Sequence, residues 1–519
     1  MGQVKTNNIT LSVAREAAVL GTLPAQPIWH LLEPNSIGGF GATITTVARD
    51  PISRNRQRRK GTITDLDSAI DFEADLTLSH FNTFAEGFAF SDAINKEITM
   101  ATTGAVATTD DYTVTALSAA QAGKLSFTTT KIASLVHARG FSTLTNNGLK
   151  SINVQPATSD TIIQVAETLT AETPGTNAVI ELAGVRALAA SGDFTWAYNA
   201  GTKRATLTSV TITDWSLLGL TLGMQVHIGS PDGAGATING FENVAANDMV
   251  GFGRVVAING ADLVLDKLSP ALAFSDAVSP TTAVDVLFGL FIRNVGTDHV
   301  DYKEQSFQFE LLYPGLDNPS GDMAEYSKGN LANEMVVNMP LSDKATISFA
   351  FVGTDTEVPT ATRKQNADTP IVPVQTGAFN TTSDCLRLGV SKIDETGLTS
   401  DFKNVTLTIA NAVTPEKVLC VLGARYMNAG NLALNIEAQA LFTDARVTDA
   451  VRTNETLTMA FGLKNDDGGI YFDIPSMTLG GGDKEFPVGE TVLVNIPGEA
   501  FADPILNTSM GISIFPILP

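Results

Sequence analysis

The feature that most constrains this chain is an alternation of acidic and apolar residues along one segment. Carboxylates occupy odd-numbered positions between 65 and 75: Asp65, Asp67, Asp71, Glu73 and Asp75. The even-numbered positions are mostly apolar, as at Leu66, Ile70 and Phe72. Because side chains alternate across a β-strand, this spacing predicts a strand with one buried face and one acidic face. Such a face is a solvated surface, a cation or catalytic site, or a wall that repels other anions.

Strand signals recur along the rest of the chain. Short runs rich in Thr, Val, Ile and Phe alternate with Gly, Asn, Asp and Pro. This pattern predicts a mainly β protein built from sandwich or barrel modules. Helices are expected only over residues 13–20, 82–95 and 443–452, each short enough to pack on a sheet.

Two internal similarities indicate how the chain is organised. Residues 69–76 (AIDFEADL) resemble residues 433–440 (ALNIEAQA), and an expected helix follows each segment. Between them, residues 140–165 resemble residues 240–265, with strand and turn signals in the same order. Repeated units point to architecture, so we expect two related strand-helix modules with small β domains inserted between them. The expected boundaries are residues 1–108 for the first module, 109–290 for the inserted β-barrel or sandwich domains, and 291–519 for the second module.

Composition excludes several classes of function. The chain has 33 basic and 55 acidic residues and a formal net charge of -22, which argues against a sequence-reading nucleic-acid binder. Two cysteines and five histidines are too few and too scattered for a disulfide framework or a zinc cluster. The sequence has no Walker loop, nucleophile elbow or HExxH motif. We therefore expect a protein with no enzymatic activity, no cofactor and no metal site.

Membrane association is not expected either. The longest apolar runs are far shorter than the roughly 20 residues that a membrane-spanning helix needs. The amino terminus has no apolar stretch behind a positive segment, so it does not resemble a secretory signal. These patterns predict a soluble protein.

A basic segment precedes the acidic one. Its charged residues lie within seven positions: Arg54, Arg56, Arg58, Arg59 and Lys60. Neither aromatic stacking residues nor a reading helix accompanies them, which argues against nucleic-acid binding. The segment is either a solvated loop or a loop that meets an acidic surface on a neighbouring subunit.

Several stretches together resemble a known family. They cover about half of the chain, mostly its ends, and comprise residues 51–68, 333–340, 347–353, 402–410, 419–423, 456–461, 469–475 and 486–497. In these stretches the sequence is similar to the tail tube proteins of long-tailed bacteriophages, also called major tail proteins. The resemblance implies β-sandwich or β-barrel tube modules with a short flanking helix, whose sheets join those of neighbouring subunits into a ring.

The same resemblance implies a structural role in the virion. Rings would stack into a hollow tube through which genomic DNA passes during ejection, without specific binding. A chain with two modules would form trimeric rings with pseudo-sixfold symmetry, with hexameric rings as the alternative. The inserted domains would decorate the outside. Implied partners are further copies of the chain, a tape-measure protein, and tail-terminator or baseplate proteins, with assembly in the host cytoplasm.

The acidic strand and the resemblance lead to one hypothesis. Carboxylates on the wall of a conduit repel phosphates and so let DNA slide. We therefore expect the five carboxylates of residues 65–75, with Glu437 in the second module, to face the lumen. Residues 54–60 are expected at the tip of a hairpin that reaches an adjacent ring.

Two alternatives from other classes stay open. One is a virion decoration or adhesion protein that binds host-surface glycans. The other is a β-rich carbohydrate-active enzyme, which needs paired carboxylates and sugar-stacking aromatic residues at a cleft. Three Trp and seven Tyr in 519 residues would make such a platform sparse.

Overall fold

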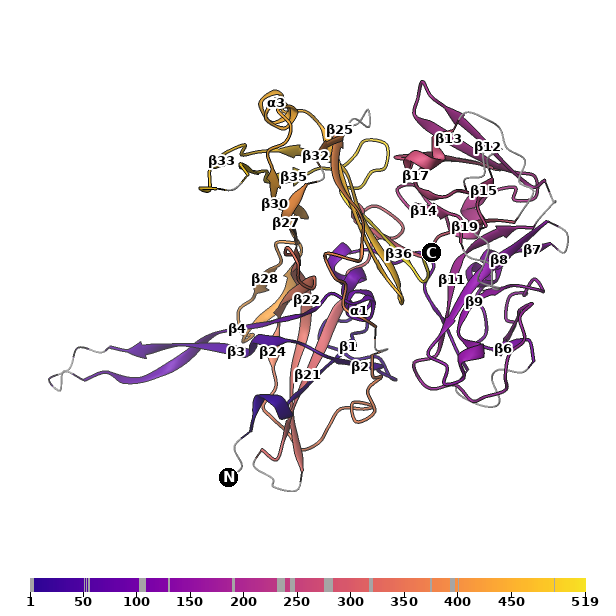
Figure 1. Cartoon of the computed structure of the whole chain (residues 1–519). Coiled ribbons are helices and arrows are strands. Elements are labelled where there is room, and N and C mark those ends of the chain that lie inside the picture. Colours follow the sequence, from indigo (N-terminus) through magenta and orange to yellow (C-terminus); the bar gives the residue numbers. More distant parts are fainter. Residues whose placement is uncertain are drawn as a thin grey trace. The chain divides into compact units, whose positions relative to one another are not determined.

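The computed structural model is mainly β, as the sequence predicts (Figure 1). It describes residues 4–50, 52, 54, 57–101, 109–128, 131–188, 192–230, 239–242, 248–274, 283–316, 321–373, 376–392, 397–399, 401–489 and 491–519. The chain divides into two compact units. Unit 1 consists of Met1–Ser91, Tyr302–Ala378 and Asn404–Glu437, and unit 2 of Asp92–Asp301, Phe379–Lys403 and Ala438–Pro519.

Unit 1 is built on an antiparallel sheet. Its elements are η1 (Thr6–Asn8), β1 (Thr10–Arg15), β2 (Trp29–Leu32), β3 (Ser36–Arg49), β4 (Arg59–Asp75), α1 (Leu78–Ala89), β21 (Ser306–Pro314), β22 (Asp322–Met339), β23 (Thr346–Gly353) and β24 (Asp355–Thr356). Later parts of the chain add β27 (Phe402–Ala410), the hairpin of β28 (Thr414–Lys417) and β29 (Ala424–Asn428), and β30 (Ala433–Leu441), which continues into unit 2. Neighbouring strands pair in the order β2, β1, β21, β22, β23, β4, β3. The second half of β22 also pairs with β27 on its other edge.

Helix α1 covers one face of this sheet. Thr77 caps its first turn by accepting a hydrogen bond from the backbone N–H of His80, and the helix ends at Phe90, which has a φ of 48°. The helix buries Phe84 against the sheet, with ring centroids 5.7 Å from Phe72 and 4.8 Å from Phe349. Aromatic packing therefore fills the side of the sheet that α1 covers.

The long inserted segment of unit 2 forms a second antiparallel sheet. Its strands are β5 (Ile98–Thr99), β7 (Phe127–Thr128), β8 (Ile132–Arg139), β9 (Gly148–Ser151), β11 (Val179–Ala187), β12 (Phe194–Asn199), β13 (Arg204–Ser209), β14 (Gln225–Ile228), β17 (Gly251–Asn259), β18 (Asp262–Asp266) and β19 (Val284–Leu287). They run in the order β12-β13-β18-β17-β14-β19-β11-β8-β7, with β5 on β11 and β9 on β8. Smaller elements are β6 (Asp111–Thr113) paired with β10 (Ile162–Gln164), β15 (Phe241–Glu242) paired with β16 (Asp248–Met249), α2 (Ala119–Lys124), η2 (Leu144–Asn146), η3 (Trp215–Leu218) and η4 (Pro270–Leu272).

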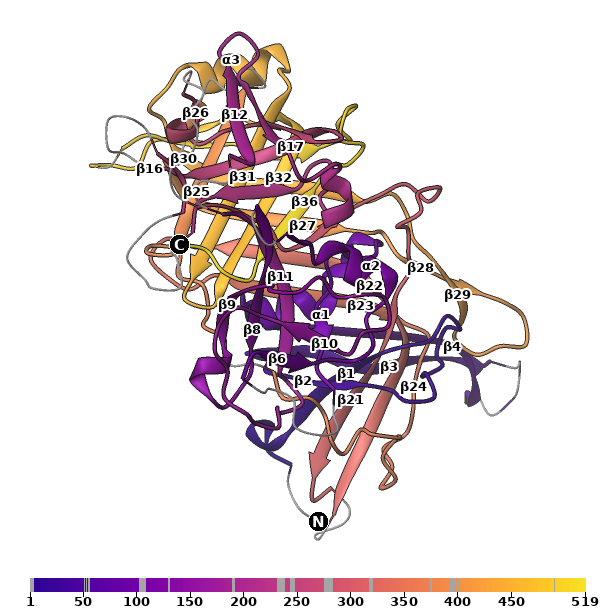
Figure 2. The same cartoon turned by 90° about the vertical axis from the view of Figure 1, so that its right-hand side faces the viewer.

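The carboxyl-terminal part of unit 2 contributes a further set of strands. These are β20 (Leu290–Arg293), β25 (Cys385–Lys392), β26 (Gly397–Thr399), β31 (Leu457–Asn465), β32 (Gly468–Leu479), β33 (Lys484–Glu485), β34 (Leu493–Asn495), β35 (Gly498–Ala500) and β36 (Gly511–Phe515), with helix α3 (Arg446–Thr453). Figure 2 shows β31, β32 and β36 side by side, and β32 pairs antiparallel with both β31 and β36. The inserted segment packs on these strands, because the ring of Phe252 lies 5.5 Å from that of Tyr471 and 5.8 Å from that of Phe515.

Two strand sets in the chain have the same connectivity. The first set runs β1, β2, β3, β4, α1, β21, β22 and β23, and the second runs β25, β26, β27, β30, α3, β31, β32 with β33, and β34 with β35. Three strand pairs of the first set have a counterpart in the second. The β1–β21 pair corresponds to β25–β31, and the β21–β22 pair corresponds to β31–β32. The β4–β23 pair corresponds to β30–β34. The similarity between residues 69–76 and 433–440 thus falls on corresponding strands, β4 and β30.

Two of the three expected helices are present and one is wrong. Helices α1 and α3 correspond to the expectations at residues 82–95 and 443–452, with shifted boundaries. The helix expected over residues 13–20 is absent: residues 13–15 are the end of β1, which pairs with both β2 and β21, and residues 16–20 are coil and turn. None of the helices in the described part of the chain has the length and apolar character needed to cross a membrane.

Candidate functional site

The acidic segment is the outward face of β4. Leu66, Ile70 and Phe72 are buried, whereas Asp67 and Asp71 are exposed. The other three carboxylates of this segment are partly exposed: Asp65, Glu73 and Asp75. Strand alternation therefore places all five carboxylates on the side of the sheet opposite α1.

This face continues across the neighbouring strands. Asp71 pairs with Ala350 of β23, Ala350 with Glu334 of β22, and Glu334 with Ala410 of β27. Glu334 is exposed and adds a carboxylate that the sequence analysis missed, because no local pattern reveals which residues of β22 lie beside β4. Other outward positions of these strands are small or neutral: Ser348, Val336 and Thr408. We call this surface of β4, β23, β22 and β27 the acidic face.

Two lysines contact the acidic face. The Lys417 ammonium lies 2.7 Å from Asp65 Oδ1 and 2.6 Å from Asp67 Oδ1, and its hydrogen bond holds the pKa of Asp65 below the ordinary value. The Lys344 ammonium lies 2.7 Å from Asp75 Oδ1. These contacts reduce the repulsion between neighbouring carboxylates, and with six carboxylates against two ammonium groups the face stays negative.

The second module's candidate residue, Glu437, lies on β30. It is exposed, and its neighbours Ile436 and Ala438 are buried. The nine residues of β30 have the same order of buried and exposed positions as the last nine of β4. Outward positions of β30 include Ala433 and Asn435, so this strand is far less acidic than β4.

The basic residues lie at the end of a long hairpin arm formed by β3 and β4, which Figure 1 shows extending from the sheet. Arg54 and Arg58 lie in the turn, while Arg59 and Lys60 begin β4; Arg56 lies outside the described residues. Arg58 Nε is 3.3 Å from Asp50 Oδ2, and both side chains are exposed. An exposed ion pair of this kind adds little stability, so the arm's charges are available to a partner.

The arm also carries exposed apolar side chains. Ile44, Val47 and Ile63 are each more than half exposed. A two-stranded ribbon without a packed core is marginally stable alone, so these side chains favour a partner surface.

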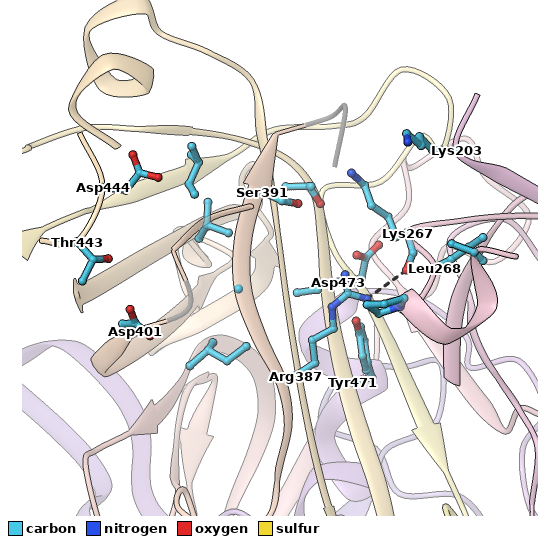
Figure 3. Close-up of a pocket in the computed structure, with 18 of the residues that line it drawn as sticks. Lys203, Lys267, Leu268, Arg387, Ser391, Asp401, Thr443, Asp444, Tyr471 and Asp473 are labelled. Carbon is cyan, nitrogen blue, oxygen red and sulfur yellow. Dashed lines mark hydrogen bonds between the residues drawn. The ribbon is translucent and has the colours of Figure 1, made fainter. Parts of the chain in front are cut away.

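Unit 2 contains a cavity of about 810 Å³ (Figure 3). Residues of β25, β31, β32 and the inserted segment line it, and Arg387 Nη1 donates a hydrogen bond to the Lys267 carbonyl oxygen over 3.1 Å. Asp473 lies 3.2 Å from Arg254, and burial raises the pKa of its carboxyl. Asp444 is paired with Arg446. The third lining carboxylate, Asp401, also has an interaction partner. Among the described lining residues there is therefore no pair of free carboxylates of the kind that glycoside hydrolysis uses.

Potential metal ligands are scattered among the described residues. Among them, no group of three or more His, Cys, Asp or Glu side chains is arranged to hold a metal ion. Lysine contacts and exposure to solvent reduce the repulsion between the crowded carboxylates of β4.

Comparison with known families decides between the classes of protein. Residues 252–500 match the family model described as phage tail tube protein. This match, over just under half of the chain, supports a phage tail tube protein. The matched part of this tail tube protein runs from β17 through β35 and so includes strands of both sets. No curated protein matches the chain.

The match supports a structural component of the virion tail, and the tail tube family implies self-assembly into a tube with other tail components. The match does not include β3, β4 or the hairpin arm. The roles of the acidic face and of the arm therefore depend on the geometry described above.

Proposed function

We propose that the chain polymerises as stacked rings into the hollow tail tube and that genomic DNA passes through this tube during ejection without specific binding. The family match over residues 252–500 supports the tube, and the tail tube family suggests a non-enzymatic role. Assembly takes place in the host cytoplasm with a tape-measure protein and with tail-terminator or baseplate proteins.

The acidic face is the observation that carries this proposal. It joins six carboxylates of β4 and β22 with small, neutral residues of β23 and β27. DNA phosphates are repelled by such a wall, and the small side chains offer few groups that could hold the bases. The face therefore lines the lumen in our proposal, and Glu437 extends it on β30.

Ring stoichiometry follows from the repeated connectivity. Two strand sets with matching pairings indicate a duplicated module, so three chains form a ring with pseudo-sixfold symmetry. Connectivity groups β21–β23 with β1–β4, so the second module begins near β25 in this proposal and not at residue 291. The inserted segment, residues 92–301 of unit 2, interrupts the first module and decorates the outside.

The hairpin arm connects successive rings in this proposal. Its basic end would meet an acidic surface of the adjacent ring, because a chain with net charge -22 offers acidic partner surfaces. Its exposed apolar side chains would be buried by the same contact.

Electron cryomicroscopy of the purified protein across a concentration series tests the proposal. We expect hollow tubes with three outer protrusions per ring, the acidic face toward the lumen and the arm against the next ring. Six protrusions per ring would favour hexamers, and the acidic face on the outer surface would contradict the lumen assignment. Discrete monomers at every concentration, together with binding on a glycan array, would favour a decoration or adhesion protein.

A further inference from the structure

Strand β3 has an edge that no strand of the described chain occupies. Its ladder runs along β4 alone. Residues 36–48 of this edge strand include neither a charged residue nor a proline. Natural proteins protect exposed edge strands with charges, prolines or covering elements, because an open edge pairs with other chains. Irregularities interrupt the β3–β4 register between Ile37 and Gly39, between Thr45 and Thr46, and between Val47 and Arg49. The regular stretch between them, residues 39–45, has no charge, proline or bulge and is therefore open to a pairing partner.

The corresponding strand of the second set shows what such a partner looks like. β27 corresponds to β3, and its second edge pairs antiparallel with β22 from Glu334 to Met339. The pairing buries Val405, Leu407 and Ile409 of β27. In β3 the inward residues opposite Phe72 and Ile70 of β4 are Ile37 and Phe40, and both are only partly buried.

Strand registers identify the counterpart of that β22 segment. One rung of the first set joins Asn338 of β22, Thr346 of β23 and Asp75 of β4. When β4 and β30 are aligned by their order of buried and exposed positions, residues 67–75 on 433–441, the matching rung of the second set joins Glu485 of β33, Leu493 of β34 and Leu441 of β30. This alignment differs by two residues from the sequence similarity of residues 69–76 with 433–440. The next rung matches as well, with Val337, Ile347 and Ala74 corresponding to Lys484, Val494 and Ala440. β33 therefore occupies the position at which β22 receives β27.

The second edge of β33 is open in the described part of the chain, where β33 pairs with β34. Its two charged side chains are engaged with their own sheet. The Lys484 ammonium lies 4.1 Å from the ring centroid of Phe442, and Glu485 accepts a hydrogen bond from Asn495 Nδ2 over 2.8 Å. Both charged side chains therefore contact groups of their own sheet, and the backbone edge of β33 is the position at which a strand would add.

We propose that β3 of one chain adds antiparallel to the β33 edge of a second chain, as β27 adds to β22 within each chain. The proposal rests on the proposed ring assembly and names the strands that join its subunits. Each ring then has two kinds of junction. The β22–β27 junction is apolar and forms as the chain folds, whereas the β3–β33 junction forms only when chains meet and buries Ile37 and Phe40.

Cysteine cross-linking of assembled tubes tests the pairing. Cys385 and Cys420 are the only cysteines of the sequence and are replaced by Ser. Glu485→Cys is then combined in turn with Ser36→Cys, Thr43→Cys or Thr45→Cys, because all four positions lie on the outward side of their strands. Cβ atoms of paired residues come close enough for a disulfide only when the strands are adjacent. We expect oxidation to convert most of the polymerised chain into disulfide-linked dimers and trimers at one of the three β3 positions.

Matched pairs calibrate the experiment. Asn338→Cys with Thr406→Cys, which are direct partners in the β22–β27 junction, gives a disulfide within the chain and no increase in mass. Glu485→Cys with Thr202→Cys, an exposed residue of the inserted segment, gives no cross-link. Tubes without a cross-link at any β3 position would overturn the inference and leave the proposed function standing. Failure of the unmodified protein to form rings or tubes, purified or in lysates of producing cells, would overturn both.

Discussion

At the scale of single residues, buried His227 makes the stability of unit 2 depend on pH. Burial lowers the pKa of its imidazole from 6.5 to about 4, despite the hydrogen bond between Nδ1 and the Gly229 carbonyl oxygen. The folded protein therefore binds this proton less readily than the unfolded chain. Its contribution to stability is present above about pH 6.5 and is lost as pH falls toward 4. Between about pH 7.5 and 5 we expect a loss of about 2 kcal/mol.

Denaturant unfolding followed by tryptophan fluorescence measures this loss. Trp196 and Trp215 belong to the same apolar core as the neighbours of His227 on β14, and Trp29→Phe removes the tryptophan of unit 1. In that background, His227→Asn keeps a hydrogen-bond donor near Nδ1 and removes the titration. An equal loss of stability at acid pH in both proteins would contradict the assignment to His227.

Residue patterns also show which part of the candidate site was predictable. Alternation alone was enough to place Asp71 and Phe72 on opposite faces of β4, since a strand's period is a local property. Neither Glu334 nor the Lys417 contacts could be found in this way, because they depend on strand pairing between segments hundreds of residues apart. Whether the face lines a lumen stays a prediction.

At the scale of elements, α1 depends on a glycine that lets it approach the sheet. A Cβ added at Gly87 would lie 2.6 Å from the Phe307 ring. We expect Gly87→Ala to destabilise the helix contact by about 1–3 kcal/mol through overpacking, which exceeds the gain of about 1 kcal/mol in helix propensity. Hydrogen exchange measured by mass spectrometry on peptides of α1 should show faster exchange in the variant.

A glycine in α2 provides the control for this prediction. Nothing lies within 4 Å of a Cβ added at Gly123. Gly123→Ala should therefore slow exchange in α2 or leave it unchanged. Unchanged exchange of α1 in Gly87→Ala would mean that the sheet adjusts and that the close approach is not required.

Elements differ in how far their own sequence determines them. The helix expected over residues 82–95 corresponds to α1, which begins and ends earlier, at Leu78 and Ala89, because helical spacing of apolar residues reveals a helix better than its ends. The pattern of residues 13–20 also predicts a helix, yet Val13–Arg15 belong to strand β1, because β2 and β21 pair with its two edges. Tertiary pairing overrides weak local preference, and β21 is almost 300 residues away in the sequence.

At the scale of the whole molecule, a buried ion cluster joins the inserted segment to the carboxyl-terminal strands within unit 2. Arg254 of β17 lies 2.9 Å from Asp266 and 3.2 Å from Asp473 of β32, and its side chain is buried. Arg254→Met leaves two carboxylates without their cation, so we expect a loss of about 3–5 kcal/mol. Adding Asp473→Asn should restore part of it. Since both segments belong to one unit, peptides of β17 and β32 should lose hydrogen-exchange protection together, while α1 in unit 1 keeps its protection. Loss confined to β17 would instead mean that the inserted segment unfolds independently of the strands on which it packs.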